Sequence, residues 1–202
     1  MELLESYCPS VYRLLPARFR SDQPWNVCRD IDAVLRELGA KADSSYDVSG
    51  LIVVHRTASV DATAIISGPA FICAGATVGP HAVLRAGTCV GEDSHIGASV
   101  EIKQSMIGPR SAIAHLNYIG NSIVGEDVNV EAGAVIANHY NEKHPSERQI
   151  VVRVSDQRVD TGTNKFGALV GDHCRIGANA VTSPGTLLGP KTVVGRLELV
   201  QQ

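Results

Sequence analysis

The sequence of 202 residues predicts an all-β solenoid, a parallel β-helix built from hexapeptide repeats. Three positions recur every six residues: a branched aliphatic residue, a small residue two places before it, and a glycine directly after it. An amphipathic helix has a period of 3.6 residues and a single strand a period of two, so neither explains this spacing. The aliphatic series runs without a break through Val60, Ile66, Ile72, Val78, Leu84, Val90, Ile96 and Ile102.

The rest of the aliphatic series gives the expected size of the solenoid. The register loses one residue before Ile107, Ile113 and Ile119, and it slips again before Val124, Val130 and Ile136. After a long interruption it resumes at Val170, Ile176, Thr182, Leu188 and Val194. With three hexads to a triangular coil, these 19 hexads predict about six coils, each burying its interior against its neighbours.

The other two repeated positions have separate physical roles. We expect the small residue to fill a crowded interior position, and it recurs at Ala58, Ala64, Ala70, Ala76 and Ala82 and then at Thr88 and Ser94. We expect the glycine to permit the positive φ of a tight corner. The glycines in question are Gly79, Gly91, Gly97, Gly108, Gly120, Gly125, Gly171, Gly177, Gly189 and Gly195.

Residues 1–48 lack the period, so we expect an N-terminal helical cap there and the β-helix over residues 49–202. Asp22 as N-cap and Pro24 in the first turn predict a helix start, and Gly39 predicts its end. One apolar helical face is expected at Cys28, Ile31, Val34, Leu35 and Leu38. This face should cover the first coil and shield that end of the stack.

A second break in the repeat predicts a loop insertion over residues 139–168. The segment 150–154, which is apolar except for Arg153, the polar stretch 155–158 and Val159 together indicate a small hairpin. Long loops in compact domains are uncommon and often functional, so we expect a lid-like loop that projects from one corner.

Composition narrows the range of functions. The formal net charge of −3 predicts no nucleic-acid partner, and no apolar run approaches the 18 residues of a membrane span. Residues 1–5 do not look like a signal peptide, so a cytoplasmic protein is expected. Its five cysteines form no C-x-x-C pair and should be reduced and mostly buried: Cys8, Cys28, Cys73, Cys89 and Cys174.

A series of motifs resembles one enzyme family. Residues 84–88 (LRAGT), 100–103 (VEIK), 114–120 (AHLNYIG), 128–130 (VNV) and 164–166 (NKF) occur in order. This run resembles the acetyltransferase domain of the bacterial bifunctional enzyme that makes UDP-N-acetylglucosamine. The resemblance implies a left-handed β-helix, acetyl-CoA as co-substrate, and a homotrimer with active sites between neighbouring subunits. It also implies transfer of the acetyl group to the amine of an amino sugar, a sugar phosphate such as glucosamine-1-phosphate.

The same resemblance assigns individual residues. His115 matches the general base, whose imidazole suits proton transfer near neutral pH, and the backbone N–H of Ala132 matches the oxyanion donor. The residues that match those holding the sugar phosphate are Arg85, Lys103, Tyr118 and Lys165. Asn129 and Asn138 match sugar-contacting positions. The path of CoA is expected at Ala178 and Arg196, although the family has small residues near the C-terminus where this chain has Arg196, which leaves the details of CoA binding open.

Departures from the family pattern leave alternatives open. His139 stands where the family has tyrosine, and the insertion separates Asn138 from Lys165. One alternative is a hexapeptide-repeat transferase with a different nucleotide-sugar or acyl acceptor, and another is a non-catalytic β-helix scaffold. The pair His139 and His144, five residues apart, also has the spacing of zinc-binding histidines in hexapeptide-repeat carbonic anhydrases, although no third ligand is evident.

Overall fold

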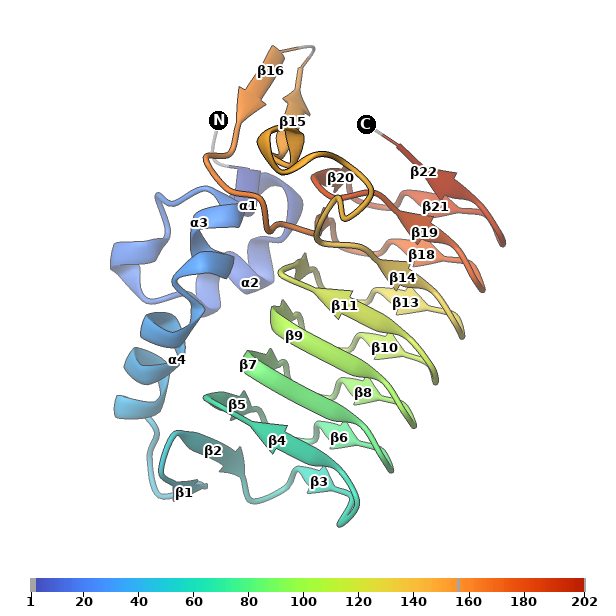
Figure 1. The fold of residues 1–202 in the computed structure, drawn as a ribbon. Helices are drawn as coiled ribbons and strands as arrows, with labels where there is room; N and C mark the ends of the chain where they lie inside the picture. Colours follow the sequence, from blue (N-terminus) through green and yellow to red (C-terminus); the bar gives the residue numbers. More distant parts are fainter. Residues whose placement is uncertain (1–2, 156, 202) are drawn as a thin grey trace.

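The chain winds into a triangular, left-handed parallel β-helix, as Figure 1 shows for this computed structural model, which describes residues 3–155 and 157–201. The predicted fold class is confirmed. The stack has seven coils, however, because one face is a sheet of seven strands. The prediction of six coils was one too low, because the repeat begins one hexad earlier, at Val54, and ends one hexad later, at Val200.

Face 1 of the triangle carries the first strand of each coil. Its members are β2 (Ile52–His55), β5 (Ala70–Ile72), the second halves of β7 (Val83–Val90) and β9 (Glu101–Ile107), β12 (Ile123–Val124), β17 (Ala168–Val170) and β20 (Thr186–Leu188). At the first coil, β1 (Tyr46–Ser49) extends this face by pairing antiparallel with β2.

Faces 2 and 3 complete each coil. Face 2 consists of β3 (Ser59–Val60), β6 (Thr77–Val78), β8 (His95–Ile96), β10 (Ala112–Ile113), β13 (Asn129–Val130), β18 (Arg175–Ile176) and β21 (Val193–Val194). Face 3 consists of β4 (Ile65–Ser67), the first halves of β7 and β9, β11 (Tyr118–Gly120), β14 (Val135–Ile136), β19 (Val181–Thr182) and β22 (Leu199–Val200). Because β7 and β9 run across the corner, faces 3 and 1 join into one sheet of 13 strands.

The interior of the coil is a column of aliphatic side chains, as the repeat predicts. Ile72, Val90, Ile96 and Ile113 are fully buried and pack on their equivalents above and below. The small position also lies inside, since Ala76 and Ala82 are fully buried. Stacking at one strand spacing, about 4.8 Å per coil, favours small residues there, although Val100 and Val128 are also buried at this position.

The glycines serve a different purpose from the one expected. None of the ten repeat glycines has a positive φ; after nine of them the positive value falls two residues later, at side-chain-bearing residues such as Asp93 and Arg110, and after Gly120 it falls at Asn121. What glycine provides is close approach between coils. A Cβ on Gly91 would lie 2.7 Å from the backbone nitrogen of Pro109, and one on Gly108 would lie 2.5 Å from the carbonyl carbon of Gly125.

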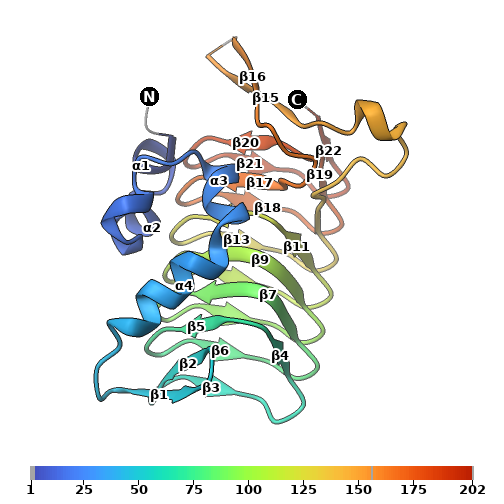
Figure 2. The same ribbon diagram turned by 60° about the vertical axis from the view of Figure 1, so that its left-hand side comes forward.

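The N-terminal helices lie along the side of the stack and not on its end (Figure 2). They are α1 (Leu3–Tyr7), α2 (Pro9–Leu14), the 3₁₀ helix η1 (Ala17–Phe19), α3 (Pro24–Arg29) and α4 (Ile31–Ala40). The chain starts beside the last coils, where Cys8 donates its thiol to the carbonyl of Val170 at 3.2 Å, and descends along face 1 to the first coil.

The predicted cap is therefore wrong in position and in detail. The expected apolar face from Cys28 to Leu38 is buried, but it packs on outward residues of face 1 such as Phe71 and Cys89. The helix is also split at Asp30, and Gln23, not Asp22, is its N-cap residue, with no side-chain capping bond.

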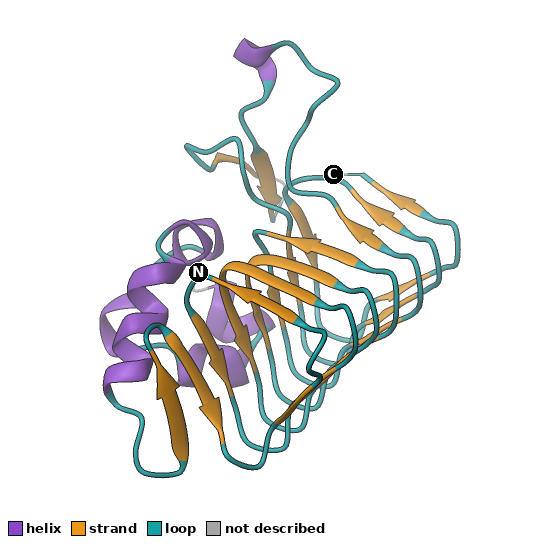
Figure 3. Cartoon of the chain, turned by 60° about the horizontal axis from the view of Figure 1, so that its bottom comes forward, coloured by secondary structure: helices purple, strands orange, loops and turns teal. Residues whose placement is uncertain are grey.

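The insertion leaves and re-enters at the corner between faces 3 and 1. It contains the 3₁₀ helix η2 (Pro145–Glu147) and the predicted hairpin, β15 (Val151–Val154) paired with β16 (Gln157–Asp160). The residues around η2 project away from the body, as Figure 3 shows at the top of the view. The hairpin also projects at its tip, and β16 is mostly exposed, but its base packs inward, with Ile150 and Val152 fully buried beside Phe166.

All five cysteines are free and buried, as predicted. Within residues 3–155 and 157–201, no helix combines the length and apolar character needed to cross a membrane.

Candidate functional site

Four of the predicted site residues occupy one vertical edge of the prism, the corner between faces 2 and 3 (the 2–3 corner). His115, Ala132, Ala178 and Arg196 each lie two residues after the interior aliphatic residue of successive coils. Backbone hydrogen bonds link them: the residue after Ala132 donates to His115 at 3.2 Å, the residue after Ala178 to Ala132 at 3.0 Å, and the residue after Arg196 to Ala178 at 3.0 Å. At about 4.8 Å per coil, the edge from His115 to Arg196 is ~14 Å long.

His115 is exposed at the point where the chain turns from face 2 to face 3. The next residue, Leu116, is also exposed and has a φ of 62°. Buried Asn117 secures the turn, because its amide donates to the carbonyl of Ala114 at 2.8 Å and its oxygen accepts the N–H of Ala134 at 2.7 Å. A rigid turn therefore presents an accessible imidazole, as a general base requires.

Face 3, which follows this corner in each coil, carries expected phosphate ligands on its outer surface. Arg85 and Lys103 lie opposite each other on β7 and β9, so their side chains share the outer surface. Burial lowers the pKa of Lys103, and the nearby cations Lys165 and Arg85 lower it further. The structure therefore brings these three cations close enough to repel one another, and a phosphate dianion would relieve that repulsion.

One residue of this cluster is missing from the sequence-based set. Glu101 holds the Arg85 guanidinium, with its Oε1 2.7 Å from Nε and 2.6 Å from Nη2. Glu101 precedes Lys103 by two residues, so strand alternation puts both on the outer surface, and this spacing was a usable signal. Arg85 is thus already oriented by a carboxylate before any ligand binds.

Tyr118 and Asn138 complete the cluster. Burial and the Glu101 carboxylate raise the pKa of Tyr118, and the Asn138 side chain hydrogen-bonds to it. Asn138 in turn donates to Asn121 at 2.5 Å. A Cβ on Gly120 would lie 2.6 Å from both the Tyr118 hydroxyl and the Asn138 amide nitrogen, so glycine leaves the space that these two groups fill.

Asn129 does not join the cluster within one chain. It is exposed on β13 of face 2, where it pairs with Ala112 and Arg175, whereas the cations lie on face 3. The predicted sugar contacts Asn129 and Asn138 therefore point to two different faces of the prism.

The returning end of the insertion contributes Lys165 to the cluster. A hollow of about 480 Å³ lies between the η2 excursion and the segment 162–164, which leads directly into Lys165. His139 contributes Nδ1 to a 3.0 Å contact with the carbonyl of Asn164, and His144 Nδ1 lies 2.8 Å from the hydroxyl of Ser146. Both histidines thus have local roles, and no group of three or more metal-ligating side chains forms among the described residues.

At the far end of the 2–3 corner, Arg196 makes a two-point ion pair with Glu131. Nε and Nη2 of Arg196 each lie 2.8 Å from a different carboxylate oxygen of Glu131. The backbone N–H of Ala178 also donates to Glu131, at 2.8 Å. The Arg196 guanidinium and then this N–H lower the pKa of Glu131 to about 2, so the carboxylate is anionic near neutral pH.

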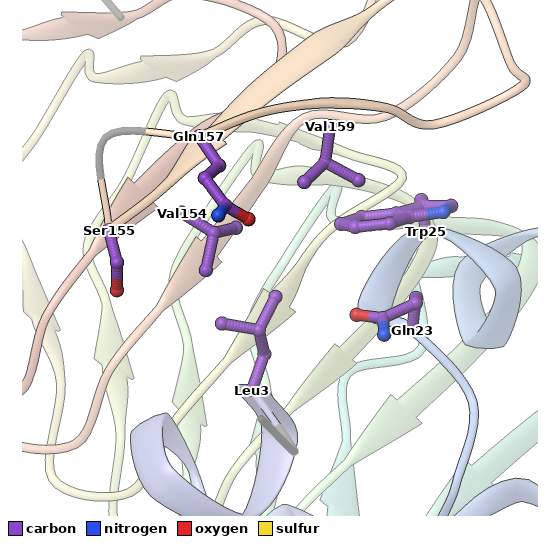
Figure 4. Close-up of a pocket in the computed structure, with 7 residues that line it drawn as sticks. All are labelled: Leu3, Gln23, Trp25, Val154, Ser155, Gln157 and Val159. Carbon is purple, nitrogen blue, oxygen red and sulfur yellow. The ribbon is translucent and has the colours of Figure 1, made fainter.

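A second hollow lies away from these residues, between the N-terminal helices and the hairpin. Its volume is about 350 Å³, and Figure 4 shows Trp25, Leu3 and Val159 around it. Two amides, Gln23 and Gln157, supply polar atoms, and none of its described lining residues is ionisable. The hydroxyl of Ser155 also lines it, but no described lining residue is an acid or base that could activate this hydroxyl, so the hollow is no candidate for the chemistry.

Comparison with known families gives a match over residues 48–159, more than half of the chain, to the family described as GMPPB C-terminal domain. The chain belongs to this family. A bifunctional sugar-1-phosphate nucleotidylyltransferase/acetyltransferase of Sulfurisphaera tokodaii is 34% identical over 186 residues, which are 86% of this chain and 45% of that protein. The bifunctional protein GlmU of Streptococcus pyogenes M3 is 40% identical over 59% of this chain and 20% of its own length. This chain therefore spans less than half of the curated relatives it matches.

Two solved structures are more distant. PerB of Caulobacter crescentus, in complex with CoA and GDP-perosamine, is 13% identical over 71% of this chain and 51% of its own, with a TM-score of 0.36. The acetyltransferase domain of PglB from Neisseria gonorrhoeae, in complex with acetyl coenzyme A, is 18% identical over 83% of this chain and 65% of its own, with a TM-score of 0.34.

The span matched to the GMPPB C-terminal domain family covers only part of the candidate site. It includes His115 and the face 3 cluster up to Asn138, and it ends inside the hairpin. Lys165, Ala178 and Arg196 lie beyond it, in the returning end of the insertion and the last two coils.

Proposed function

We propose that this protein transfers the acetyl group of acetyl-CoA to the amine of an amino sugar phosphate, such as glucosamine-1-phosphate. The observation that carries the proposal is the position of His115. Its exposed imidazole lies on the 2–3 corner, in the same column as Ala132, Ala178 and Arg196, and face 3, which begins at this corner, carries the cations Arg85 and Lys103. A general base next to both a candidate CoA path and a candidate phosphate site suits acyl transfer to a phosphorylated amine.

In the proposed reaction, the sugar nitrogen attacks the thioester carbonyl while His115 removes a proton from that nitrogen. The backbone N–H of Ala132, one coil above, donates to the oxygen on which negative charge develops. Collapse of the tetrahedral intermediate breaks the carbon–sulfur bond, and CoA leaves as a thiol with the proton returned by the imidazolium. Asn117 keeps the turn around His115 in place throughout.

The acceptor phosphate would bind on face 3. Arg85, Lys103 and Lys165 supply the positive charge, and the Tyr118 hydroxyl supplies a further donor. Glu101 orients Arg85 so that one edge of the guanidinium stays available to the phosphate. The S. tokodaii relative, named as a sugar-1-phosphate nucleotidylyltransferase/acetyltransferase, supports an acceptor of this class.

The proposed assembly is a homotrimer. Asn129 on face 2 can contact a sugar bound on face 3 only if a neighbouring subunit supplies it, so a shared site accounts for both asparagines. Since all five cysteines are free, we place the enzyme in the cytoplasm, where thiols stay reduced.

The test is a screen of amino sugars and their phosphates for release of free thiol from acetyl-CoA. With the best acceptor, His115→Ala should lower kcat by roughly 10²–10⁴-fold at an unchanged melting temperature. His81→Asn is the matched control, because His81 lies at the same corner two coils below and asparagine tolerates its φ of 57°. Equal losses in both variants, or equal loss of stability and activity in His115→Ala, would show that His115 is structural.

A further inference from the structure

Glu131 stands at a position where the 2–3 corner elsewhere favours glycine. Directly after the interior aliphatic residue, four coils have glycine at this corner: Gly79, Gly97, Gly177 and Gly195. The reason is steric, since a Cβ on Gly177 would lie 2.6 Å from the backbone nitrogen of Arg196. The exceptions are Ala114, Glu131 and, in the first coil, Asp61, whose carboxylate stays within its own turn by accepting from Thr63.

The Glu131 side chain reaches over the next two coils. Its carboxylate accepts the N–H of Ala178, one coil above, and both donors of Arg196, two coils above, all at 2.8 Å. A single internal anion therefore occupies the two groups that the sequence assigns to the CoA path. Where a ligand oxygen would bind, the chain supplies an oxygen of its own.

The surroundings suit an anionic ligand with an apolar part. A hollow of about 360 Å³ on face 2 is bounded by the Glu131–Arg196 pair, Asn129 and Arg175, with the exposed side chain of Val193 along it. Arg175 is likewise held by a carboxylate, that of Asp127, at 3.1 Å. Two guanidiniums thus flank the hollow, and each is neutralised by an acidic residue of this chain.

We propose that Glu131 is an internal competitor for the acyl donor, and that it sets the affinity for a phosphate-bearing thioester such as acetyl-CoA. The proposal rests on the proposed function and adds a specificity determinant to the same site. For the donor to bind, the carboxylate rotates away from Ala178 and Arg196, and these groups then bind donor oxygens. Both side chains are partly exposed, so this rotation exchanges one anion for another without breaking the core.

The decisive comparison is Glu131→Gln against Glu198→Gln. Glu198 lies at the same corner and accepts the N–H of Gly195 at 2.6 Å, so its replacement removes the same charge without freeing Ala178 or Arg196. Isothermal titration with CoA should give a Kd roughly three- to tenfold lower for Glu131→Gln, since exposed ion pairs and rim charges have modest effects. The Kd for Glu198→Gln should stay within about twofold of the unsubstituted protein. The KM for acetyl-CoA should follow the Kd, while kcat changes little.

A double-mutant cycle with Arg196→Gln provides the second measurement. If Glu131 sequesters Arg196, removing Arg196 should weaken CoA binding more in the Glu131→Gln background than in the unsubstituted protein. Equal losses in the two backgrounds would overturn the proposal.

The other outcomes are equally distinct. If Glu131 is only a clasp that fastens the last coil, Glu131→Gln lowers the melting temperature and leaves the Kd unchanged, and the competitor idea is wrong. If Glu131→Gln and Glu198→Gln lower the Kd for CoA equally, the effect comes from the change in net charge alone, and the proposal is also refuted. If the unsubstituted protein binds CoA but Glu131→Gln binds it no better, this inference fails alone. If neither protein binds CoA and no acceptor releases thiol, the proposed function fails with it.

Discussion

The insertion can be tested most sharply, because its two parts should contribute very different amounts to the free energy of unfolding. Residues 142–149 form the η2 excursion and are mostly exposed, whereas Ile150 and Val152 are fully buried. Replacing residues 142–149 with a short Gly/Ser linker should cost well under 1 kcal/mol, since loop-closure entropy changes slowly with length. Truncating one buried isoleucine, Ile150→Ala, should cost about 2–5 kcal/mol.

Thermal and urea unfolding would measure the difference. For a chain of this size, ~3 kcal/mol lowers the melting temperature by roughly 6–12 °C, whereas the linker variant should melt within about 3 °C of the unsubstituted protein. Arg158→Ala is the control within the hairpin, because that side chain is exposed. A linker variant as unstable as Ile150→Ala, or a neutral Ile150→Ala, would refute the division into a dispensable excursion and a structural hairpin.

This division also limits how the predicted lid can be tested. Replacing the whole of residues 142–161 would remove Ile150 and Val152 from the core beside Phe166 and Trp25, whose rings lie 5.8 Å apart. A loss of activity would then report unfolding and say nothing about the acceptor. Only the excursion, next to the hollow that leads into Lys165, can be tested as a selectivity element.

Two further predictions concern the cation cluster and the assembly. Lys103→Met should stabilise the unliganded protein, because it removes repulsion from Lys165 and Arg85, while binding of a phosphorylated acceptor should weaken roughly tenfold or more. The folded-state pKa of Lys103 lies below its unfolded value, so its unfavourable contribution should fade as pH rises toward 10.5, and urea unfolding at two alkaline pH values should show this slope only when Lys103 is present. Static light scattering should find a trimer, and an active monomer would contradict the shared site inferred from Asn129 and Asn138.

The coil could be predicted from the sequence because each side of the triangular coil takes about six residues, so interior residues recur with that period. One coil is 18 residues in the regular part, so Arg85 and Lys103 had to fall opposite each other. The face 3 cluster followed from that spacing and from the motifs. The number of coils was harder to predict, because the first and last hexads, at Val54 and Val200, match the repeat pattern less well than the others.

The position of the helices was not predicted, although the sequence contained a signal for it. On face 1 the residue before the interior aliphatic is also apolar, as in Phe71–Ile72, Met106–Ile107 and Leu169–Val170. On face 2 the same place is mostly polar, as at His95, Asn129 and Arg175, although Ala112 and Val193 are apolar. A strand apolar on both sides is buried on both sides, so face 1 needed a cover. The role of the glycines and the reach of Glu131 depend on distances between coils, which a linear pattern does not reveal.

The helices along face 1 have a consequence for how the molecule comes apart. A plain solenoid holds each coil only through its neighbours, so it frays from its ends and can unravel stepwise. Here one buried layer extends from Val53 in the first coil to Leu169 in the sixth, with the helices as a strut across the coils. Loosening any coil then disturbs contacts that the others share. Amide exchange should therefore show nearly uniform protection along face 1, as in a single cooperative unit, and gradual fraying only on the uncovered faces.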